Sequence, residues 1–378
     1  MTKKIGIITI LKVNNYGAEL QAYALQRCLN SLGYDAEVID YLFYKHPDHV
    51  RESISRPFYP YPLKNKILEF GLSVRDRLTR LFASPSQKRR QKNFDDFHIA
   101  NTRLSHTFHS LSELQNGCPE YDVYCVGSDQ VWNPRCFTNL APYLLSFAPD
   151  NARKISYASS FGVSSLPSSA EAQYAKFLNR FDAIAVREAA GADIVKKLIG
   201  RDAKIVLDPT LLLSPNDWAT IEKPVPNLPD RYLLTYELRP QSALANLAQE
   251  IARRQGLKIV RLGCRQKFYS DPVVNIADAG PAEFLYLFRN AAFVVTNSFH
   301  GTAFSVNFSK PFFSVLERGR NNNSRQLSLL NACGLDSQVY YDGDPFPSSF
   351  DVDFSSATQR LASLRNSSIE YLNSAING

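Results

Sequence analysis

Short apolar runs alternate with helical patterns from the start of the chain. Residues 3–10, KKIGIITI, have the pattern of a buried strand, and a polar turn separates them from 18–33, where apolar positions recur at helical spacing. Gly33 is a stop signal for that helix, and residues 35–41 form the next strand pattern. A strand, a helix and a strand in this order predict the start of a parallel sheet.

The same alternation continues along the chain, in two sets. A Pro- and Asp-rich stretch at 214–230 separates the sets and is the predicted linker. The pattern therefore predicts an α/β protein with two Rossmann-like, doubly wound domains facing a cleft, with ligands at the carboxyl ends of the strands. The further strands are predicted at 121–127, 154–162, 182–188, 203–210, 231–238, 257–263, 273–278, 291–297 and 311–316.

Domain boundaries follow from this division. We expect an N-terminal domain at 1–215, a C-terminal domain at 216–355, and a helix at 356–378 that packs back on the N-terminal domain. A basic helical insertion is predicted at about 63–100, with apolar residues on one stripe. It is either a solvated helical hairpin or a basic amphipathic surface that meets an anionic membrane or a lipid-linked substrate.

Composition narrows the class of protein. A chain of 378 residues exceeds one ordinary core, and a net charge of +7 favours anionic partners. The N-terminus lacks a secretory signal pattern, no run of about 20 apolar residues occurs, and the six cysteines form no CxxC pair. We therefore expect a cytoplasmic protein with reduced thiols, in peripheral contact with the inner face of the membrane.

Several classes of chemistry lack their motifs. None of the polar clusters at the strand ends described below holds a DxD, a HExxH or a Walker glycine loop, so we expect neither a metal site nor a bound cofactor. The turn after the first strand lacks GxGxxG, so a dinucleotide is not indicated. Nucleic acid is not an expected partner, because no recognition motif is present and the positive charge gathers at 63–92.

Polar groups follow the predicted strands of the first domain. Asn15 and Tyr16 lie in the stretch NNYGAELQ, where the amides that open a helix can hold an anion. In the stretch VGSDQVWNP, Asp129, Gln130 and Trp132 combine hydrogen-bonding groups with a flat apolar ring, a set suited to a sugar. An ordinary strand-to-helix turn and a capped turn with a packed tryptophan remain the alternatives.

Arg187 ends another predicted strand, in the stretch AVREAAG. A guanidinium binds a phosphate or a carboxylate with two parallel hydrogen bonds, so this position suits an anionic ligand. Glu188 is the alternative partner, in a structural ion pair.

The second domain has two such clusters. In the stretch VVTNSFHGTAFS, Ser298, His300 and Gly301 join a strand to a helix N-terminus, where free N–H groups attract anions. A packed, structural histidine is the alternative. In the stretch LERGRNNNSRQLSLL, three guanidinium groups suit a doubly charged anion unless they form a solvated charge run; they belong to Arg318, Arg320 and Arg325.

Seven stretches of the chain, over about residues 5–335, together resemble the polysaccharide pyruvyl transferase family. They are NNYGAELQAYAL, VGSDQVWNP, ISYASSFG, VREAAG, LDPTLLL, TNSFHGTAFSVNFSKPF and NNNSRQLSLLNACGL. The resemblance implies a GT-B-like fold and an enzyme that uses phosphoenolpyruvate as co-substrate. Its product would be a cyclic pyruvate ketal on two hydroxyls of a hexose, galactose-type by expectation, in a surface glycan or its lipid-linked precursor.

Site roles follow from that resemblance. His300 matches the family's SFHG histidine and is the expected catalytic residue, as general acid or as phosphate stabiliser. Donor binding is assigned to Arg187, Ser298, Gly301, Arg318, Arg320 and Arg325, and acceptor binding to Asn15, Tyr16, Asp129, Gln130 and Trp132. The competing interpretations are a GT-B glycosyltransferase that uses a nucleotide sugar, and a basic, aromatic-rich binding protein without enzymatic activity.

Overall fold

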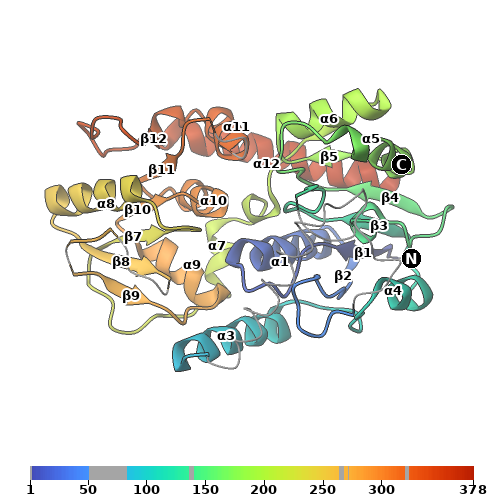
Figure 1. The fold of residues 1–378 in the computed structure, drawn as a ribbon, viewed down its shortest axis with the longest axis horizontal. Helices are drawn as coiled ribbons and strands as arrows, with labels where there is room; N and C mark the ends of the chain where they lie inside the picture. Colours follow the sequence, from blue (N-terminus) through green and yellow to red (C-terminus); the bar gives the residue numbers. More distant parts are fainter. Residues whose placement is uncertain (1, 51–82, 136–139, 264–267, 271, 320–322) are drawn as a thin grey trace. The chain divides into compact units, whose positions relative to one another are not determined.

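The computed structural model describes residues 2–50, 83–135, 140–263, 268–270, 272–319 and 323–378. Contacts within the chain define two compact units, both built from parallel strands and helices (Figure 1). Unit 1 comprises Met1–Ser84, His98–Leu212 and Ser367–Gly378, and unit 2 comprises Pro85–Phe97 and Leu213–Asn366.

Unit 1 is built on a parallel sheet in the order β2-β1-β3-β4. The chain runs from β1 to β2 on one side and returns to β3 on the other, so its direction reverses between β1 and β3. In such sheets the crevice at the carboxyl ends of those two strands is the usual ligand position. The strands are β1 (Lys4–Ile8), β2 (Asp35–Val38), β3 (Val123–Val126) and β4 (Arg153–Ser156).

A short parallel ladder extends this unit. It pairs β5 (Ala185–Val186) with β6 (Lys204–Ile205), and single bridges join Ile155 to Ala183 and Ser159 to Val186. The loops that follow β4 and β5 are therefore fixed beside the loop that follows β3.

Helices cover the unit 1 sheet because alternate strand residues are apolar. Ile5 and Ile7 of β1 pack against Leu25 of α1 (Tyr16–Ser31), in a core that also holds Leu372 near the end of α12. Ile8 lies in the core that contains Trp132. The other helices of the unit are α4 (Leu111–Gly117), α5 (Ser168–Leu178), α6 (Ala189–Ile199) and the short 3-10 turns Pro142–Leu144 and Pro209–Leu211.

Unit 2 holds a parallel sheet in the order β12-β11-β10-β7-β8-β9. The chain builds one half outward from β7 and the other outward from β10, so its direction reverses between these two neighbours. The carboxyl ends of β7 and β10 are therefore the expected ligand position in this unit. The strands are β7 (Tyr232–Tyr236), β8 (Lys258–Leu262), β9 (Val274–Ile276), β10 (Phe293–Thr296), β11 (Phe312–Leu316) and β12 (Val339–Tyr341).

Helices pack on this sheet in the same way. Leu244, Leu247 and Ile251 of α8 (Ser242–Gln255) share a core with Leu233 of β7 and Val295 of β10. The further helices are α7 (Pro215–Ala219), α9 (Pro281–Asn290), α10 (Phe299–Asn307), α11 (Ser324–Cys333) and the 3-10 turn Asp336–Gln338. Two helices have residues in both units: α3 (Pro85–Asn101) and α12 (Ser355–Asn377).

The α/β class with parallel sheets is confirmed, and several details differ from the sequence prediction. The strand patterns at 154–162 and 203–210 yield much shorter strands, and β12 was not predicted. The units divide after Leu212, and residues 85–97 belong to unit 2, whereas the sequence placed them in the N-terminal domain. The stretches at 154–162 and 203–210 contain apolar residues that are buried in loops. A run of apolar residues in the sequence does not show whether it forms a strand or a buried loop.

The basic insertion is only partly visible, since its predicted helix at 63–82 lies outside the described residues. In α3, which follows, Arg89 forms an ion pair with Asp278 at 2.7 Å, and Lys92 pairs with Asp96 at 2.6 Å. None of the helices in the described ranges has the length and apolar character needed to cross a membrane.

Candidate functional site

Asn15 lies on the loop that follows β1 and is the N-cap residue of α1. Its Oδ1 accepts hydrogen bonds from the N–H groups of Gly17 (3.0 Å) and Ala18 (3.4 Å), and the side chain is exposed. The sequence analysis predicted that the amides at the start of this helix can bind an anion. In the structure, the Asn15 side chain already accepts hydrogen bonds from two of these amides. Tyr16 is buried in this structure. Their predicted contact with an acceptor stays a prediction.

Asp129 follows β3, across the reversal point from Asn15. Its φ of +71° places a non-glycine residue in the left-handed region, which costs roughly 1 kcal/mol or more. The backbone is fixed there because Ser160 N–H donates to its carbonyl at 3.0 Å. Oδ1 accepts from Gln130 N–H at 2.8 Å, and the side chain keeps 15% of its surface exposed. The fold therefore holds a reachable carboxylate in a strained position.

Gln130 is held by its neighbours. Its Oε1 accepts a hydrogen bond of 2.5 Å from Asn133 Nδ2, and both groups lie against Gly162. Gly162 has a φ of +62°, and a β-carbon there would lie 2.7 Å from Asn133 Nδ2. The loop after β4 can approach these amides so closely only because residue 162 is glycine.

Trp132 lies in the core and not at an open surface, which differs from the sequence interpretation. Its ring is fully buried, with ring centroids 5.2 Å from Phe161 and 5.8 Å from Phe181. Its Nε1–H donates to the carbonyl of Tyr143 at 2.8 Å, and its own carbonyl accepts from Tyr174. A sugar cannot stack on a ring that is enclosed by other aromatic residues. The prediction that Trp132 contacts the acceptor by stacking is therefore wrong, and the residue is part of the core.

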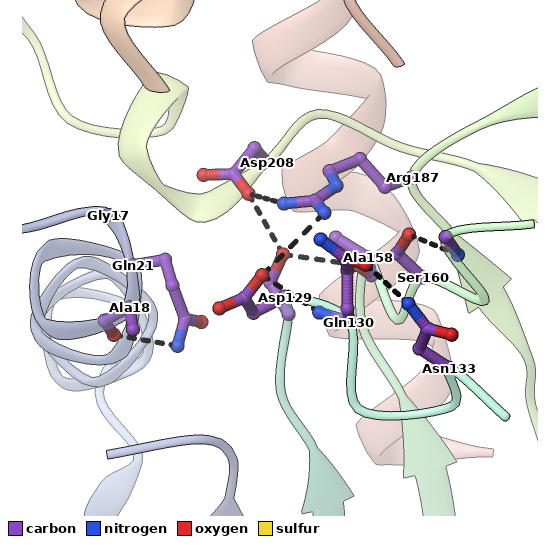
Figure 2. A network of polar contacts seen from close by, with 12 residues as sticks. Gly17, Ala18, Gln21, Asp129, Gln130, Asn133, Ala158, Ser160, Arg187 and Asp208 are labelled. Atoms are coloured by element: carbon purple, nitrogen blue, oxygen red, sulfur yellow. Dashed lines mark hydrogen bonds and ion pairs between the residues drawn. The ribbon is translucent and has the colours of Figure 1, made fainter. Parts of the chain in front are cut away.

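Arg187 is enclosed by carboxylates (Figure 2). Its Nη1 lies 2.8 Å from Asp208 Oδ2, and Glu188 and Asp129 lie at 3.8 and 3.9 Å. Burial alone would lower the pKa of Arg187, but attraction to Asp208, Glu188 and Asp129 outweighs it and raises the pKa. The guanidinium is buried and is paired with nearby negative charge, and its expected role in donor binding stays a prediction. The structural ion pair with Glu188 was the alternative that the sequence left open.

Besides Glu188, polar residues that the sequence interpretation did not single out complete this network, among them Asp208 and Gln21. Asp208 accepts from Ser128 Oγ at 2.9 Å, and Glu188 accepts from Ser160 Oγ at 2.7 Å. Gln21, on α1, is also buried beside the reversal point. A signal existed for each, because Asp208 lies in LDPTLLL and Gln21 is a polar residue inside a helix of apolar spacing.

His300 lies in the first turn of α10, directly after β10. Ser298 caps this helix, because its Oγ accepts from Gly301 N–H at 3.3 Å. His300 is only 7% exposed, and its ring lies edge-on to Phe299 at 5.2 Å. Ser298, His300 and Gly301 are therefore brought together at the carboxyl end of β10, which is the reversal point of this sheet.

The predicted arginine cluster is only partly assembled. Arg325, in α11, lies over the ring of Phe299 with 5.9 Å between the guanidinium carbon and the ring centroid. It therefore belongs to the same group as His300. Arg318 forms an ion pair with Asp344 and is largely exposed, so a carboxylate already binds its charge. Arg320 lies outside the described residues.

Asn297 was not predicted, although it precedes the predicted group directly. Its Oδ1 accepts from Leu238 N–H at 2.9 Å, and its Nδ2 donates to the carbonyl of Arg239 at 3.0 Å. Its carbonyl accepts from Gln326 Nε2 at 3.4 Å. Asn297 thus joins the loops that follow β7 and β10 to the start of α11, and all of these elements meet at the reversal point.

Cysteines and metal ligands do not add to these sites. Within the described ranges, no three His, Cys, Asp or Glu side chains are grouped as a metal site would require. Burial raises the pKa of the Cys118 and Cys125 thiols to about 12, which leaves them protonated near neutrality. The expectation that no metal or cofactor takes part stays a prediction.

Solved structures with similar chains include sugar-nucleotide enzymes. The UDP-GlcNAc 2-epimerase from Neisseria meningitidis is 10% identical, with 98% of this chain and 93% of that chain covered and a TM-score of 0.48. The UDP-GlcNAc 2-epimerase from Methanocaldococcus jannaschii is 11% identical, with 96% and 99% covered and a TM-score of 0.46. An alpha-glucosyltransferase in complex with UDP and DNA is 9% identical, with 100% and 95% covered and a TM-score of 0.47. With TM-scores below 0.5, none of these likenesses carries a conclusion about this chain.

A family model decides the relationship instead. No curated protein matches the chain. The model described as "Polysaccharide pyruvyl transferase" matches residues 15–318, which is more than half of the chain. The match includes the loops at the carboxyl ends of β3 and β10, where Asp129 and His300 lie. The chain is therefore an enzyme that belongs to the polysaccharide pyruvyl transferase family.

Proposed function

We propose that the enzyme transfers the enolpyruvyl group of phosphoenolpyruvate to two hydroxyls of a hexose and releases phosphate. The hexose is galactose-type and belongs to a surface polysaccharide or to its lipid-linked precursor. The product is a cyclic pyruvate ketal. One observation carries this proposal: His300, which lies within the matched residues and resembles the family's SFHG histidine, is in the first turn of α10, at the reversal point of a parallel sheet. Ligands of such sheets bind at that position.

The donor is assigned to unit 2. Phosphoenolpyruvate carries a phosphate and a carboxylate, and a helix N-terminus together with guanidinium groups can bind both. We assign Ser298, Gly301 and Arg325 to donor binding, with the exposed Arg318 and with Arg320 as further candidates. His300 either protonates the methylene carbon or stabilises the departing phosphate. We expect the reaction to use neither a metal nor a cofactor, so dialysis against EDTA should leave turnover unchanged.

The test of this function is a turnover assay. The protein is incubated with phosphoenolpyruvate and a panel of hexosides, and phosphate release and acceptor mass are measured together. The expected result is equal amounts of phosphate and of an acceptor that has gained one pyruvate less one water. His300→Gln should lower kcat by about 100-fold or more, whereas the exposed control His106→Gln should not. Transfer from a nucleotide sugar in place of phosphoenolpyruvate would identify a glycosyltransferase instead.

We also propose that the enzyme works in the cytoplasm, at the inner face of the membrane, where lipid-linked saccharides are reached. The support is the net charge of +7 and the basic residues at 63–92. Sedimentation with vesicles that contain anionic lipid tests this, and binding should weaken as salt rises. Equal sedimentation with neutral vesicles would contradict the electrostatic argument.

A further inference from the structure

Gln21 carries a buried acceptor oxygen at the reversal point of unit 1. Its side chain is fully buried, and its Nε2 donates to Thr9 Oγ1 and to the carbonyl of Ala18, both at 2.9 Å. No described residue donates to its Oε1. The amide orientation is fixed by its surroundings: Thr9 Oγ1 donates its own proton to Ser128, so a flipped amide would place oxygen against two acceptors.

Asp129 offers a second acceptor close by. Thr9 connects the two residues, because it accepts from Gln21 and donates to the carbonyl of Ser128, the neighbour of Asp129. Figure 2 shows the Gln21 side chain extending from α1 toward the Asp129 carboxylate. Asp129 uses Oδ1 for Gln130 N–H and for Arg187, and among the described residues its hydrogen bond and its ion pair both involve this oxygen and not Oδ2. Backbone strain at such a residue is a recognised sign of function.

The surrounding charge selects the kind of ligand. Of the three carboxylates around Arg187, Asp208 and Glu188 are buried and each accepts a hydrogen bond from a serine hydroxyl, whereas Asp129 stays partly exposed. Asp208 also accepts from the guanidinium. One guanidinium faces three carboxylates, so the local charge is negative. A negative site lined by free acceptors favours neutral hydrogen-bond donors over phosphate, and sugar hydroxyls are such donors.

We infer that Asp129 and Gln21 bind two hydroxyl groups of the hexose acceptor, and that the Asp129 carboxylate removes the proton of the attacking hydroxyl. This inference rests on the proposed function. It gives Gln21 a binding role and Asp129 a catalytic one, and it leaves Arg187 as the residue that positions Asp129.

The chemical step balances without any further reactant. Asp129 takes the proton of the first hexose hydroxyl while the oxygen of that hydroxyl bonds to C2 of the enolpyruvyl group. The electrons of the C2–C3 double bond take up a proton at the methylene carbon. The C2–O bond to phosphate then breaks, the phosphate leaves with the electron pair, and the second hydroxyl oxygen bonds to C2. Two hydroxyl protons are lost overall; one equivalent ends on the new methyl group and the other on the released phosphate.

Two variants test the inference in the full-length protein. Asp129→Asn keeps a residue type that tolerates the left-handed region, so the fold should survive while the proton acceptor is lost. Gln21→Met keeps the length of the side chain and removes Oε1. Asp202→Asn is the matched control, because its carboxylate is 89% exposed on the same unit. Melting temperature, kcat, KM for a methyl hexoside and thermal stabilisation by phosphoenolpyruvate are measured for each protein.

The expected results separate the two roles. Asp129→Asn should lower kcat by about 100- to 10,000-fold, with stabilisation by phosphoenolpyruvate unchanged. Gln21→Met should raise KM for the hexoside by about 3- to 10-fold. A folded Asp129→Asn enzyme with the kcat of the control would overturn the catalytic role, and an unchanged hexoside KM in Gln21→Met would overturn the binding role.

Failure of the proposed function gives a different result. In that case the wild type releases no phosphate from phosphoenolpyruvate with any hexoside. The site is then judged by calorimetric titration of methyl hexosides without donor. Weaker binding by Gln21→Met than by Asp202→Asn would support the hydroxyl site, and equal binding would overturn it.

Discussion

Gly301→Ala should destabilise unit 2, although alanine is the better helix former. A β-carbon at 301 would lie 2.9 Å from Thr296 Cβ and 3.0 Å from Cγ2, with Oγ1 nearer still. Carbon atoms pack at about 3.5–4.0 Å, so Thr296 must move. It is fully buried and β-branched, and its Oγ1 donates to the carbonyl of Tyr236 at 2.7 Å and accepts from Ser298 N–H at 3.1 Å.

The magnitude follows from these contacts. Overpacking costs about 1–3 kcal/mol, and loss of one hydrogen bond costs about 0.5–1.5 kcal/mol. The higher helix propensity of alanine stabilises the folded state by about 1 kcal/mol relative to glycine and offsets part of this loss. The net loss in unfolding free energy is therefore about 0.5–3.5 kcal/mol, which corresponds to a fall in melting temperature of roughly 1–14 °C for a domain of this size.

Differential scanning calorimetry provides the measurement. Gly117→Ala is the matched control, because that helical glycine has nothing closer than 3.5 Å to its added carbon, and it should be neutral or stabilising. In a double-mutant cycle, Thr296→Ala should recover part of the loss caused by Gly301→Ala. A Gly301→Ala protein that melts at or above the wild-type temperature would refute the steric reasoning.

Three further predictions concern burial. Trp132→Ala should lower the unfolding free energy by about 3–5 kcal/mol in urea titrations, and Trp132→Phe should leave acceptor KM unchanged; an acceptor-specific loss in the phenylalanine variant would restore the stacking role. Arg187→Met should cost about 3–5 kcal/mol because it leaves buried carboxylates uncompensated, and Asp208→Asn in the same protein should recover part of this; a neutral single variant would contradict the ion-pair network. Burial raises the pKa of the Cys125 thiol from 9.0 to about 12 and that of Cys333 to about 11, so the unfolded chain loses these protons first and stability should fall as pH rises from about 9 to 12. Alkaline urea titrations of Cys125→Ala should show a shallower fall, and an unchanged pH slope would count against this cause.

Local signals in the sequence were sufficient for much of the candidate site. Strand patterns that end in polar residues placed Asp129 and His300 at the carboxyl ends of strands, since that position depends only on where each apolar run stops. The stretch TNSFHG predicted a helix N-terminus directly after a strand, and Ser298 of this stretch caps that helix through Gly301 N–H. These features are set by residues that are neighbours in the chain.

The tertiary structure decided what the long-range contacts determine. Trp132 is a core residue because aromatic residues about 30 and 50 positions later enclose it, and no local pattern reports that. Arg187 meets Asp208 only because the loops after β5 and β6 lie side by side. Thr9 and the carbonyl of Ala18 accept from the Gln21 amide and so fix its orientation, and no described residue donates to its oxygen. The sequence by itself determined that polar residues follow β3 and β10, because each apolar run stops there; only folding determined which polar residues are already paired and which remain available to a ligand.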